Sequence, residues 1–109
     1  MNFIQAGTVS IIVPCYNEKD LIEAKIRNLE ELNYSKNKKD ILIVDGGSED
    51  GTWELLSANK EIRICCIEHQ GKNIQLNTGL RLAKGDFIVC TDVDGVMEKS
   101  CLNRIMREF

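Results

Sequence analysis

The stretch Val9-Ser-Ile-Ile-Val-Pro-Cys-Tyr-Asn-Glu18 decides the fold, because it joins a short, continuously apolar strand to a polar turn and a helix. Val9–Val13 is rich in β-branched residues, and Pro14 is predicted to end the strand because it cannot donate to a ladder. Asn17 and Asp20 have the spacing of the two partners in a helix capping box. The apolar residues that follow recur at helical spacing: Leu21, Ile22, Ile26, Leu29 and Leu32. A buried strand is therefore predicted to run directly into an amphipathic helix.

Strand and helix patterns alternate over the rest of the chain. Apolar runs predict three more strands, at 41–44, 62–67 and 87–90. Helical patterns follow these runs, from about residue 50, over 74–83 and over 98–109. The interruption by Arg63 marks the third strand as an edge strand. Continuously apolar strands that alternate with helices indicate a mostly parallel sheet with helices on both faces, so the prediction is an α/β fold with three layers, αβα.

The chain of 109 residues is short enough for one domain, which we expect at 9–109 after a lead-in at 1–8. The apolar side of the third helix is predicted to consist of Leu76, Leu80 and Ala83. The apolar side of the last helix is predicted to consist of Leu102, Ile105, Met106 and Phe109. Since no further residues follow to cover that last side, we expect a fragment of a longer protein. A homodimer through this exposed helix is a further prediction.

Composition argues against several classes of protein. The 14 basic and 17 acidic side chains give a net charge of −3, which argues against nucleic acid as a partner. No apolar run approaches the roughly 20 residues of a membrane span, and the first residues do not resemble a signal peptide. The five cysteines are an odd number without CxxC spacing. They argue against disulfides and zinc, and favour a reducing, cytoplasmic location. The phosphate-loop and GxGxxG signatures are absent.

A pair of aspartates, Asp92 and Asp94, directly follows the fourth predicted strand. In an open parallel sheet, ligands bind outside the carboxyl ends of the strands. Residues two apart in an extended segment point the same way, so both carboxylates can face one site. Two such oxygen ligands favour Mg²⁺ or Mn²⁺, which neutralises charge on a leaving diphosphate. The alternative is a solvated acidic turn, helped by Gly95.

The other loops at this edge offer hydrogen-bonding groups. Asp45 either accepts hydrogen bonds from a base or ribose, or bonds the amides of its own loop. Pro14 and Tyr16 either line a planar base or pack the turn. Lys72 either meets phosphate or is solvated, and His69 is expected to be a surface loop residue. The sequence contains no Ser-His-Asp or Cys-His set for nucleophilic catalysis.

With these motifs in place, the sequence resembles the N-terminal, nucleotide-sugar-binding part of the family 2 glycosyltransferases of the A-type fold. The resemblance runs from about Val9 to the end of the chain. Four segments carry it, in order: Val9-Ser-Ile-Ile-Val-Pro-Cys-Tyr-Asn-Glu18, Ile43-Val-Asp-Gly-Gly-Ser-Glu-Asp-Gly-Thr52, Asn77-Thr-Gly79 with Ala83-Lys-Gly85-Asp86-Phe-Ile88, and Asp92-Val-Asp94. The implied strand order is 3-2-1-4, a Rossmann-like sheet that forms the first half of the A-type domain.

The resemblance implies transfer of a sugar from a nucleotide diphosphate sugar, UDP-linked, to an acceptor, with inversion and with Mn²⁺ or Mg²⁺ as cofactor. Pro14, Tyr16 and Glu18 are implied to lie around the nucleoside, and Asp45 to bond the uracil. Asp92 is implied to face the ribose or the metal, and Asp94 the metal and diphosphate. Implied acceptors are a glycan, a polysaccharide or a lipid carrier, and full-length relatives often work at the cytoplasmic face of the membrane.

The sequence departs from the family pattern at two points. Leu76 stands where the family often has an arginine, so Lys72 or Lys84 would have to replace the donor contact expected of that arginine. The acceptor-binding half and the base that deprotonates the acceptor are expected outside these residues. The segment alone is therefore expected to bind nucleotide weakly and to transfer no sugar.

Two other functions remain open. A nucleotidyltransferase-like enzyme would need a glycine-rich, basic loop after the first strand, and residues 14–18 are neither. A degenerate, non-catalytic nucleotide-binding domain would keep the fold without the chemistry. A receiver-like signalling module is excluded, because Asn17-Glu18 and Glu68-His69 stand where it needs an acidic pair and a phosphorylated aspartate.

Overall fold

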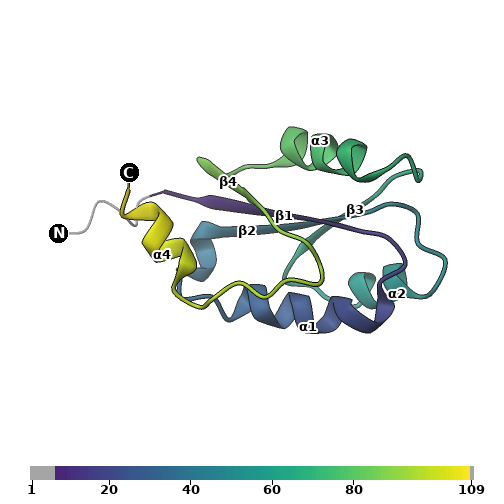
Figure 1. Cartoon of the computed structure of the whole chain (residues 1–109), viewed down its shortest axis with the longest axis horizontal. Helices are drawn as coiled ribbons and strands as arrows, with labels where there is room; N and C mark the ends of the chain where they lie inside the picture. The colour runs from purple at the N-terminus through teal and green to yellow at the C-terminus, as the bar shows by residue number, and fades with distance from the viewer. Residues whose placement is uncertain (1–6, 109) are drawn as a thin grey trace.

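The computed structural model describes residues 7–108, in which strands and helices alternate along the chain as predicted (Figure 1). The strands are β1 (Val9–Cys15), β2 (Lys39–Asp45), β3 (Arg63–Cys66) and β4 (Phe87–Cys90). The helices are α1 (Lys19–Glu30), α2 (Thr52–Ser57), α3 (Lys72–Leu82) and α4 (Cys101–Met106), and a 3₁₀ turn, η2 (Lys36–Lys38), precedes β2.

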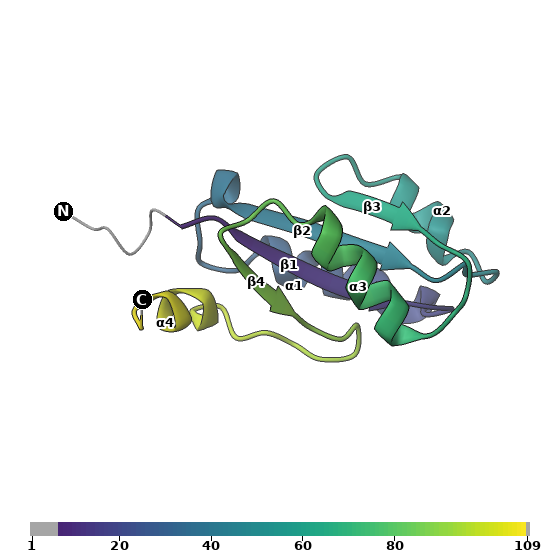
Figure 2. The ribbon, with the colours of Figure 1, turned by 90° about the horizontal axis from the view of Figure 1, so that it is seen from above.

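The strands form one parallel sheet in the order β3-β2-β1-β4, which confirms the predicted order (Figure 2). β1 is hydrogen-bonded on both sides: Val9–Cys15 pairs with Lys39–Asp45, and Val9–Ile12 pairs with β4. β3 lies at an edge, as the interruption at Arg63 predicted. The chain first moves from β1 toward β2 and β3 and then returns to add β4 on the other side. The carboxyl end of β1 is therefore the switch point at which such sheets bind ligands.

Pro14 lies inside β1 rather than at its end, so the predicted end of this strand is wrong. The carbonyl of Ile12 accepts the N–H of Thr91. Pro14, two residues farther on, faces the same side, beyond the part of β1 that pairs with β4. No ladder partner there requires an N–H, so the strand accommodates the proline and continues to Cys15.

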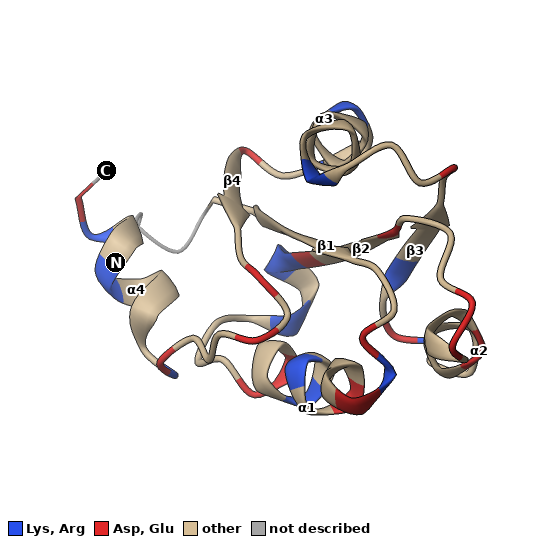
Figure 3. Cartoon of the chain, turned by 45° about the vertical axis from the view of Figure 1, so that its right-hand side comes forward, with Lys and Arg blue, Asp and Glu red and all other residues tan. Residues whose placement is uncertain are grey.

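Helices cover both faces of the sheet, which confirms the three layers (Figure 3). α1 and α2 lie on one face and α3 lies on the other. Alternate residues of the strands divide between two cores. The larger core, with α1, α2 and α4, buries side chains that include Val9, Ile11, Val13, Ile22, Leu29 and Leu102. The smaller core, under α3, buries Ile12, Leu42 and Val44.

The predicted capping box at the start of α1 is wrong. Glu18 is the N-cap residue, and its side chain forms no capping hydrogen bond; Asp50 Oδ2, from the loop after β2, accepts the N–H of Lys19 at 3.1 Å instead. Asn17 has a left-handed backbone with φ of 51°, a conformation that asparagine tolerates better than most residues. Its N–H donates to Ser48 Oγ at 2.8 Å, and its Oδ1 accepts the N–H of Glu49 at 2.8 Å. Asn17 therefore joins the loop after β1 to the loop after β2, instead of pairing with Asp20.

The buried side of α3 differs from the predicted one. Its buried residues are Gln75, Thr78 and Gly79. Leu76 and Ala83 do pack against the smaller core, but Leu80 is 46% exposed. Gly79 lies so close to β1 that a Cβ there would be 2.5 Å from Ile12 Cγ2. The helix approaches the sheet over its small residue, which a pattern of apolar residues cannot reveal.

The prediction that α4 has an uncovered apolar side is also wrong. Leu102 and Met106 are buried in the larger core, and Ile105 alone of the described apolar side remains exposed, at 41%. Phe109 lies outside the described residues. A homodimer through this helix therefore loses the apolar surface on which its prediction depended. Within residues 7–108, no helix has the length and apolar character needed to cross a membrane.

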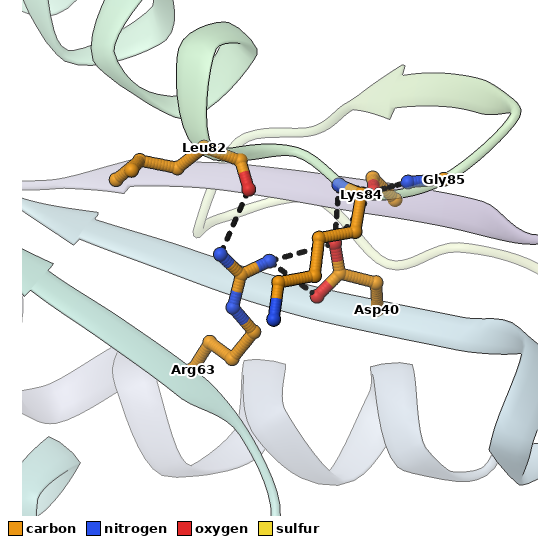
Figure 4. A network of polar contacts seen from close by, with 6 residues as sticks. Asp40, Arg63, Leu82, Lys84 and Gly85 are labelled. Carbon is orange, nitrogen blue, oxygen red and sulfur yellow. Dashed lines mark hydrogen bonds and ion pairs between the residues drawn. The ribbon is translucent and has the colours of Figure 1, made fainter.

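Asp40 is the centre of a polar network at the amino-terminal end of the sheet (Figure 4). Its carboxylate accepts from Ser10 Oγ at 2.6 Å, from Arg63 Nη1 at 2.8 and 2.9 Å, and from the N–H of Lys84 at 3.1 Å. Arg63 Nη2 also donates to the carbonyl of Leu82 at the end of α3. Burial would raise the pKa of Asp40, but these hydrogen bonds lower it below its ordinary value of 3.8. The network ties α3 to the sheet at the end opposite the strand termini that bind ligands.

We expect Gly79→Ala to lower the free energy of unfolding by about 1–3 kcal/mol, because the new methyl group must displace Ile12 in a packed core. The alanine gains helix propensity, which acts in the opposite direction. Urea denaturation measures the change. Asn73→Ala, at an exposed position of the same helix, is the control and should change stability by less than about 0.5 kcal/mol. A Gly79→Ala variant as stable as the wild type would contradict the close contact.

We expect Asp40→Asn to lower the free energy of unfolding at neutral pH by about 1–3 kcal/mol, because Arg63 loses its charged partner. The pKa of Asp40 is lower in the folded chain than in the unfolded one. Its stabilisation is therefore present above the unfolded pKa and is lost as the pH falls through the folded pKa.

Urea titrations between about pH 3 and pH 7 test this dependence, with the exposed Asp20→Asn as control. The wild type and the control should lose stability more steeply at acidic pH than Asp40→Asn does. Parallel pH profiles for all three proteins would show that Asp40 contributes no pH-dependent stability.

Candidate functional site

A pocket of about 350 Å³ lies at the carboxyl end of β1, the turn after β4 and the first turn of α3. The predicted residues that line it are Pro14, Tyr16, Glu18, Lys72, Asp92 and Asp94. Cys15, His69, Gln75 and Val93 complete the lining. Asp45 lies at the same edge of the sheet but does not line the pocket. Loops that are far apart in the sequence thus meet at the switch point.

Asp92 and Asp94 both face the pocket, while Val93 between them is buried in the larger core. The sequence predicted that both carboxylates face one site, but it placed them on an extended segment, whereas Val93 and Asp94 form a turn. Asp92 forms an ion pair with Lys72, and both side chains are more than half exposed, at 56% and 57%. The hydrogen bond to Asp92 raises the pKa of Lys72, so the ammonium stays charged. The pocket therefore presents the acidic pair, the carboxylate of Glu18 and one cation.

The loop that carries Asp92 and Asp94, the acidic loop, is bonded by the buried side chain of Lys25. The sequence analysis missed this residue. Its side chain is buried on the sheet side of α1. Its Nζ donates to Thr91 Oγ1 at 3.0 Å and to the carbonyl of Gly95 at 2.6 Å, on either side of the acidic pair. Burial lowers the pKa of Lys25, and the nearby charges of Asp92 and Asp94 act in the opposite direction. A lysine on the predicted apolar side of the helix was the signal that could have revealed it.

The protein groups alone do not complete a metal site. Among residues 7–108, no three side chains of His, Cys, Asp or Glu come together in a way that could hold an ion. Enzymes often hold Mg²⁺ with one or two carboxylates, and substrate phosphates and water supply the other ligands. Asp92 and Asp94 fit a shared site of this kind, in which the substrate completes the coordination. Lys72 contacts one of these carboxylates in the structure.

Tyr16 and His69 stack on each other, with ring centroids 3.8 Å apart and an angle of 16° between the planes. His69 is exposed, as expected of a surface loop residue, but it also lines the pocket. Its place directly after the third strand, at the ligand-binding edge, was the available signal. Glu18 accepts the N–H of Tyr16 at 3.4 Å and donates its own N–H to Thr52 Oγ1 at 3.1 Å. These contacts place a flat aromatic surface at the pocket, of the kind that planar rings pack against.

Asp45 is fully buried, and it bonds its own loop. Its carboxylate accepts the N–H groups of Gly47 at 3.2 Å and Ser48 at 2.9 Å, and the hydroxyl of Ser48 at 2.5 Å. The thiols of Cys15 and Cys66, level with it on the neighbouring strands, also donate to it. Burial and the charge of Asp45 raise the pKa of both thiols, so they remain protonated donors. Of the two predicted alternatives, the structure contains the bonds within the loop.

Gln75 is a further pocket residue that the sequence analysis missed. Its side chain is 3% exposed, and its Nε2 donates to the carbonyls of Cys15 at 2.8 Å and Val44 at 2.9 Å. The amide therefore joins the first turn of α3 to the carboxyl ends of β1 and β2. Apolar spacing does not single it out, since it lies between Ile74 and Leu76.

Comparison with known proteins places this chain in a family. Residues 10–109 match the model of the family described as glycosyl transferase family 2. The poly-β-1,6-N-acetyl-D-glucosamine synthase of Staphylococcus aureus is 33% identical over 113 aligned positions, which cover 100% of this chain and 27% of that protein. The chain thus spans about a quarter of the length of this relative.

Solved structures share the fold. The mannosyltransferase PcManGT from Pyrobaculum calidifontis, in complex with GDP-Man and Mn²⁺, matches with a TM-score of 0.81 and 33% identity, over 92% of this chain and 32% of that chain. The glucosyl-3-phosphoglycerate synthase of Mycobacterium tuberculosis, in complex with Mn²⁺, UDP and glucosyl-3-phosphoglycerate, matches with a TM-score of 0.67 and 26% identity, over 82% of this chain and 34% of that chain. Since the family match covers nearly the whole chain, the chain belongs to glycosyl transferase family 2.

Proposed function

We propose that residues 9–109 form the donor-binding region of a glycosyltransferase that transfers a sugar from a UDP-sugar to an acceptor, with inversion at the anomeric carbon. The observation that supports this proposal is the convergence of Asp92, Asp94 and Lys72 with the ring of Tyr16 in one pocket at the switch point. Two similar structures contain a nucleotide together with Mn²⁺, GDP-Man in one and UDP in the other.

The charged side of the pocket is proposed to bind the diphosphate. Asp94 and Asp92 would hold Mn²⁺ or Mg²⁺ together with the diphosphate, and the bound ion would neutralise the charge that develops as the diphosphate leaves. Lys72 is proposed to move from Asp92 to a phosphate oxygen when the nucleotide binds. This exchange keeps a charge-assisted hydrogen bond on the ammonium and frees a carboxylate oxygen for the cation.

The other side of the pocket is proposed to bind the nucleoside. Tyr16 offers its ring to the base, and Pro14 and Glu18 form the adjoining wall. Asp45 is proposed to act through the loop that it holds, because its oxygens already accept hydrogen bonds from Gly47 and Ser48. In this arrangement the nucleotide lies across the end of β1, with its diphosphate beside β4.

The acceptor is proposed to bind to a part of the protein outside residues 9–109. An inverting displacement needs a base on the face opposite the leaving diphosphate, and we propose that this base also lies there. The segment alone would then bind nucleotide weakly and transfer no sugar. The similarity to a polysaccharide synthase favours a polysaccharide acceptor over a glycan or a lipid carrier. The nucleotide sugar would be drawn from the cytoplasm, at the membrane face where the whole protein works.

A degenerate nucleotide-binding domain is the second candidate. Two observations favour it. Leu76 stands in place of the arginine expected from the family pattern, and the carboxylate of Asp92 already forms an ion pair with Lys72. Such a domain would bind nucleotide without any requirement for a divalent cation.

We expect Mn²⁺ to raise the affinity of the chain for UDP by at least roughly tenfold, because the cation bridges two carboxylates and the diphosphate. Asp94→Asn should abolish this gain, since the amide carries no charge. Titration calorimetry with UDP, with and without Mn²⁺, measures both effects. Asp86→Asn, which makes the same change at the opposite end of β4, is the matched control and should keep the gain. UDP affinity that is indifferent to both Mn²⁺ and Asp94 would instead support the degenerate domain.

We expect Lys25→Met to loosen the acidic loop without unfolding the chain, because methionine fills the space of the lysine stem but donates no hydrogen bond to Thr91 or Gly95. The substitution removes the cost of burying the ammonium, which offsets part of the cost of the two lost hydrogen bonds. Hydrogen exchange of the Thr91 amide, which donates to the carbonyl of Ile12, should become at least roughly tenfold faster, which corresponds to the loss of one charge-assisted bond. Exchange at this amide as slow as in the wild type would show that Lys25 does not hold the loop.

A further inference from the structure

Within residues 7–108, the buried amide of Gln75 forms hydrogen bonds through its nitrogen only. Nε2 donates both of its hydrogens to main-chain carbonyls, those of Cys15 and Val44. The opposite orientation of the amide would set Oε1 against the same two carbonyl oxygens, neither of which can donate. The chemistry of its neighbours therefore fixes which atom is the oxygen. Within residues 7–108, no donor forms a hydrogen bond with Oε1.

The side chain of Gln75 lines the pocket. Every fully buried side-chain nitrogen or oxygen in the described part of the chain has a hydrogen-bond partner. Oε1 has none, so it is not fully buried, although the side chain as a whole is only 3% exposed. The opening that Gln75 lines is the pocket between the aromatic pair and the acidic pair.

The amide of Gln75 is also held in place by packing. A Cβ on Gly46 would lie 3.1 Å from Cδ and Nε2 and 3.2 Å from Oε1 of Gln75, so only a glycine lets the amide lie at this depth without displacement. Two hydrogen bonds and this contact leave the amide little freedom to rotate. Oε1 is therefore a preorganised acceptor at the pocket, and its unmet hydrogen bond can be supplied by a ligand.

The position of Gln75 relative to the strands determines which part of a bound nucleotide lies beside it. Its amide bridges the ends of β1 and β2, whereas Asp92 and Asp94 follow β4 on the far side of β1. With strands about 4.8 Å apart, the two groups are separated by roughly 7 Å across the sheet. A nucleotide whose diphosphate lies at the acidic pair therefore extends its nucleoside toward Gln75. The carboxylate of Asp45, which was expected to bond the base, is already occupied by its own loop.

We propose that Gln75 is a specificity-determining residue whose Oε1 accepts a hydrogen bond from the ring N–H of the base, N3–H in uracil. This inference rests on the proposed function and adds a recognition residue to it. A base that presents no N–H at this position leaves Oε1 without a donor when the pocket is filled. A site that has a buried polar group left unpaired rejects the analogue strongly, so we expect a discrimination of at least roughly tenfold.

NMR titration of the 109-residue chain with UDP and with N3-methyl-UDP, both in the presence of Mg²⁺, tests the proposal. The readout is the ratio of the two dissociation constants in the wild type, in Gln75→Met and in Gln70→Met. Gln70→Met makes the same chemical change at an exposed position and is the matched control. A second readout, in the wild type alone, is the side-chain amide signal of Gln75, which does not depend on whether the variant folds.

The wild type and Gln70→Met should bind UDP at least roughly tenfold more tightly than N3-methyl-UDP, and the ratio should fall close to one in Gln75→Met. The amide signal of Gln75 should shift with UDP and much less with N3-methyl-UDP. An equal ratio in all three proteins, or a Gln75 signal that both nucleotides shift alike, overturns the proposal. The proposal is also overturned if the wild type prefers UDP over 2′-deoxy-UDP and Gln75→Met loses that preference, because Oε1 would then accept from the ribose hydroxyl. If the wild type binds no UDP, the proposed function itself fails.

Discussion

The pairing of β1 with neighbours on both sides is the constraint on which the rest of the structure depends. β2 follows β1 in the sequence and pairs along its whole length, whereas β4 is added last and pairs with its first part only. This difference in length leaves the end of β1 open on the β4 side, beside the turn that carries Asp92 and Asp94. The pocket exists because β4 and its acidic turn stop short of the end of β1.

Two aspartates, one at each end of the sheet, have their hydrogen bonds satisfied within the fold, whereas polar groups at the pocket do not. Asp40 at one end and Asp45 at the other accept several hydrogen bonds each from their surroundings, and both hold segments of the fold together. Asp94 and the oxygen of Gln75 border the pocket, and no side chain or main-chain donor is seen to bond them in the described part of the chain. Asp94 is exposed and can be satisfied by water, whereas the unpaired oxygen of the nearly buried Gln75 needs an explanation, and a ligand is the simplest one.

Periodicity and order along the chain predicted the four strands, their parallel arrangement, the three layers and most of the residues that line the pocket, and the resemblance to the family implied the order of the strands. It failed where one side chain meets a distant segment. The contact of Gly79 with Ile12 shifts the buried side of α3 away from Leu80, and the link from Asn17 to the loop after β2 replaces the expected helix cap. Lys25 and Gln75 escaped notice for the same reason, because their partners lie on other elements and are mostly main-chain carbonyls, which no residue pattern encodes.

The acidic pair lies between two lysines with different freedom, and this difference bears on how the site could be filled. Lys25 is buried and bonded to the loop on both sides of the pair, so its departure would cost the loop its conformation. Lys72 is exposed, and its polar partner within residues 7–108 is a carboxylate oxygen of Asp92, so solvent or a phosphate can take its place. In the proposed function, a cation and a diphosphate therefore replace Lys72 while Lys25 stays. The loop then keeps its conformation on binding. It loses the ion pair with Lys72 but keeps the hydrogen bonds that Lys25 donates to Thr91 and Gly95.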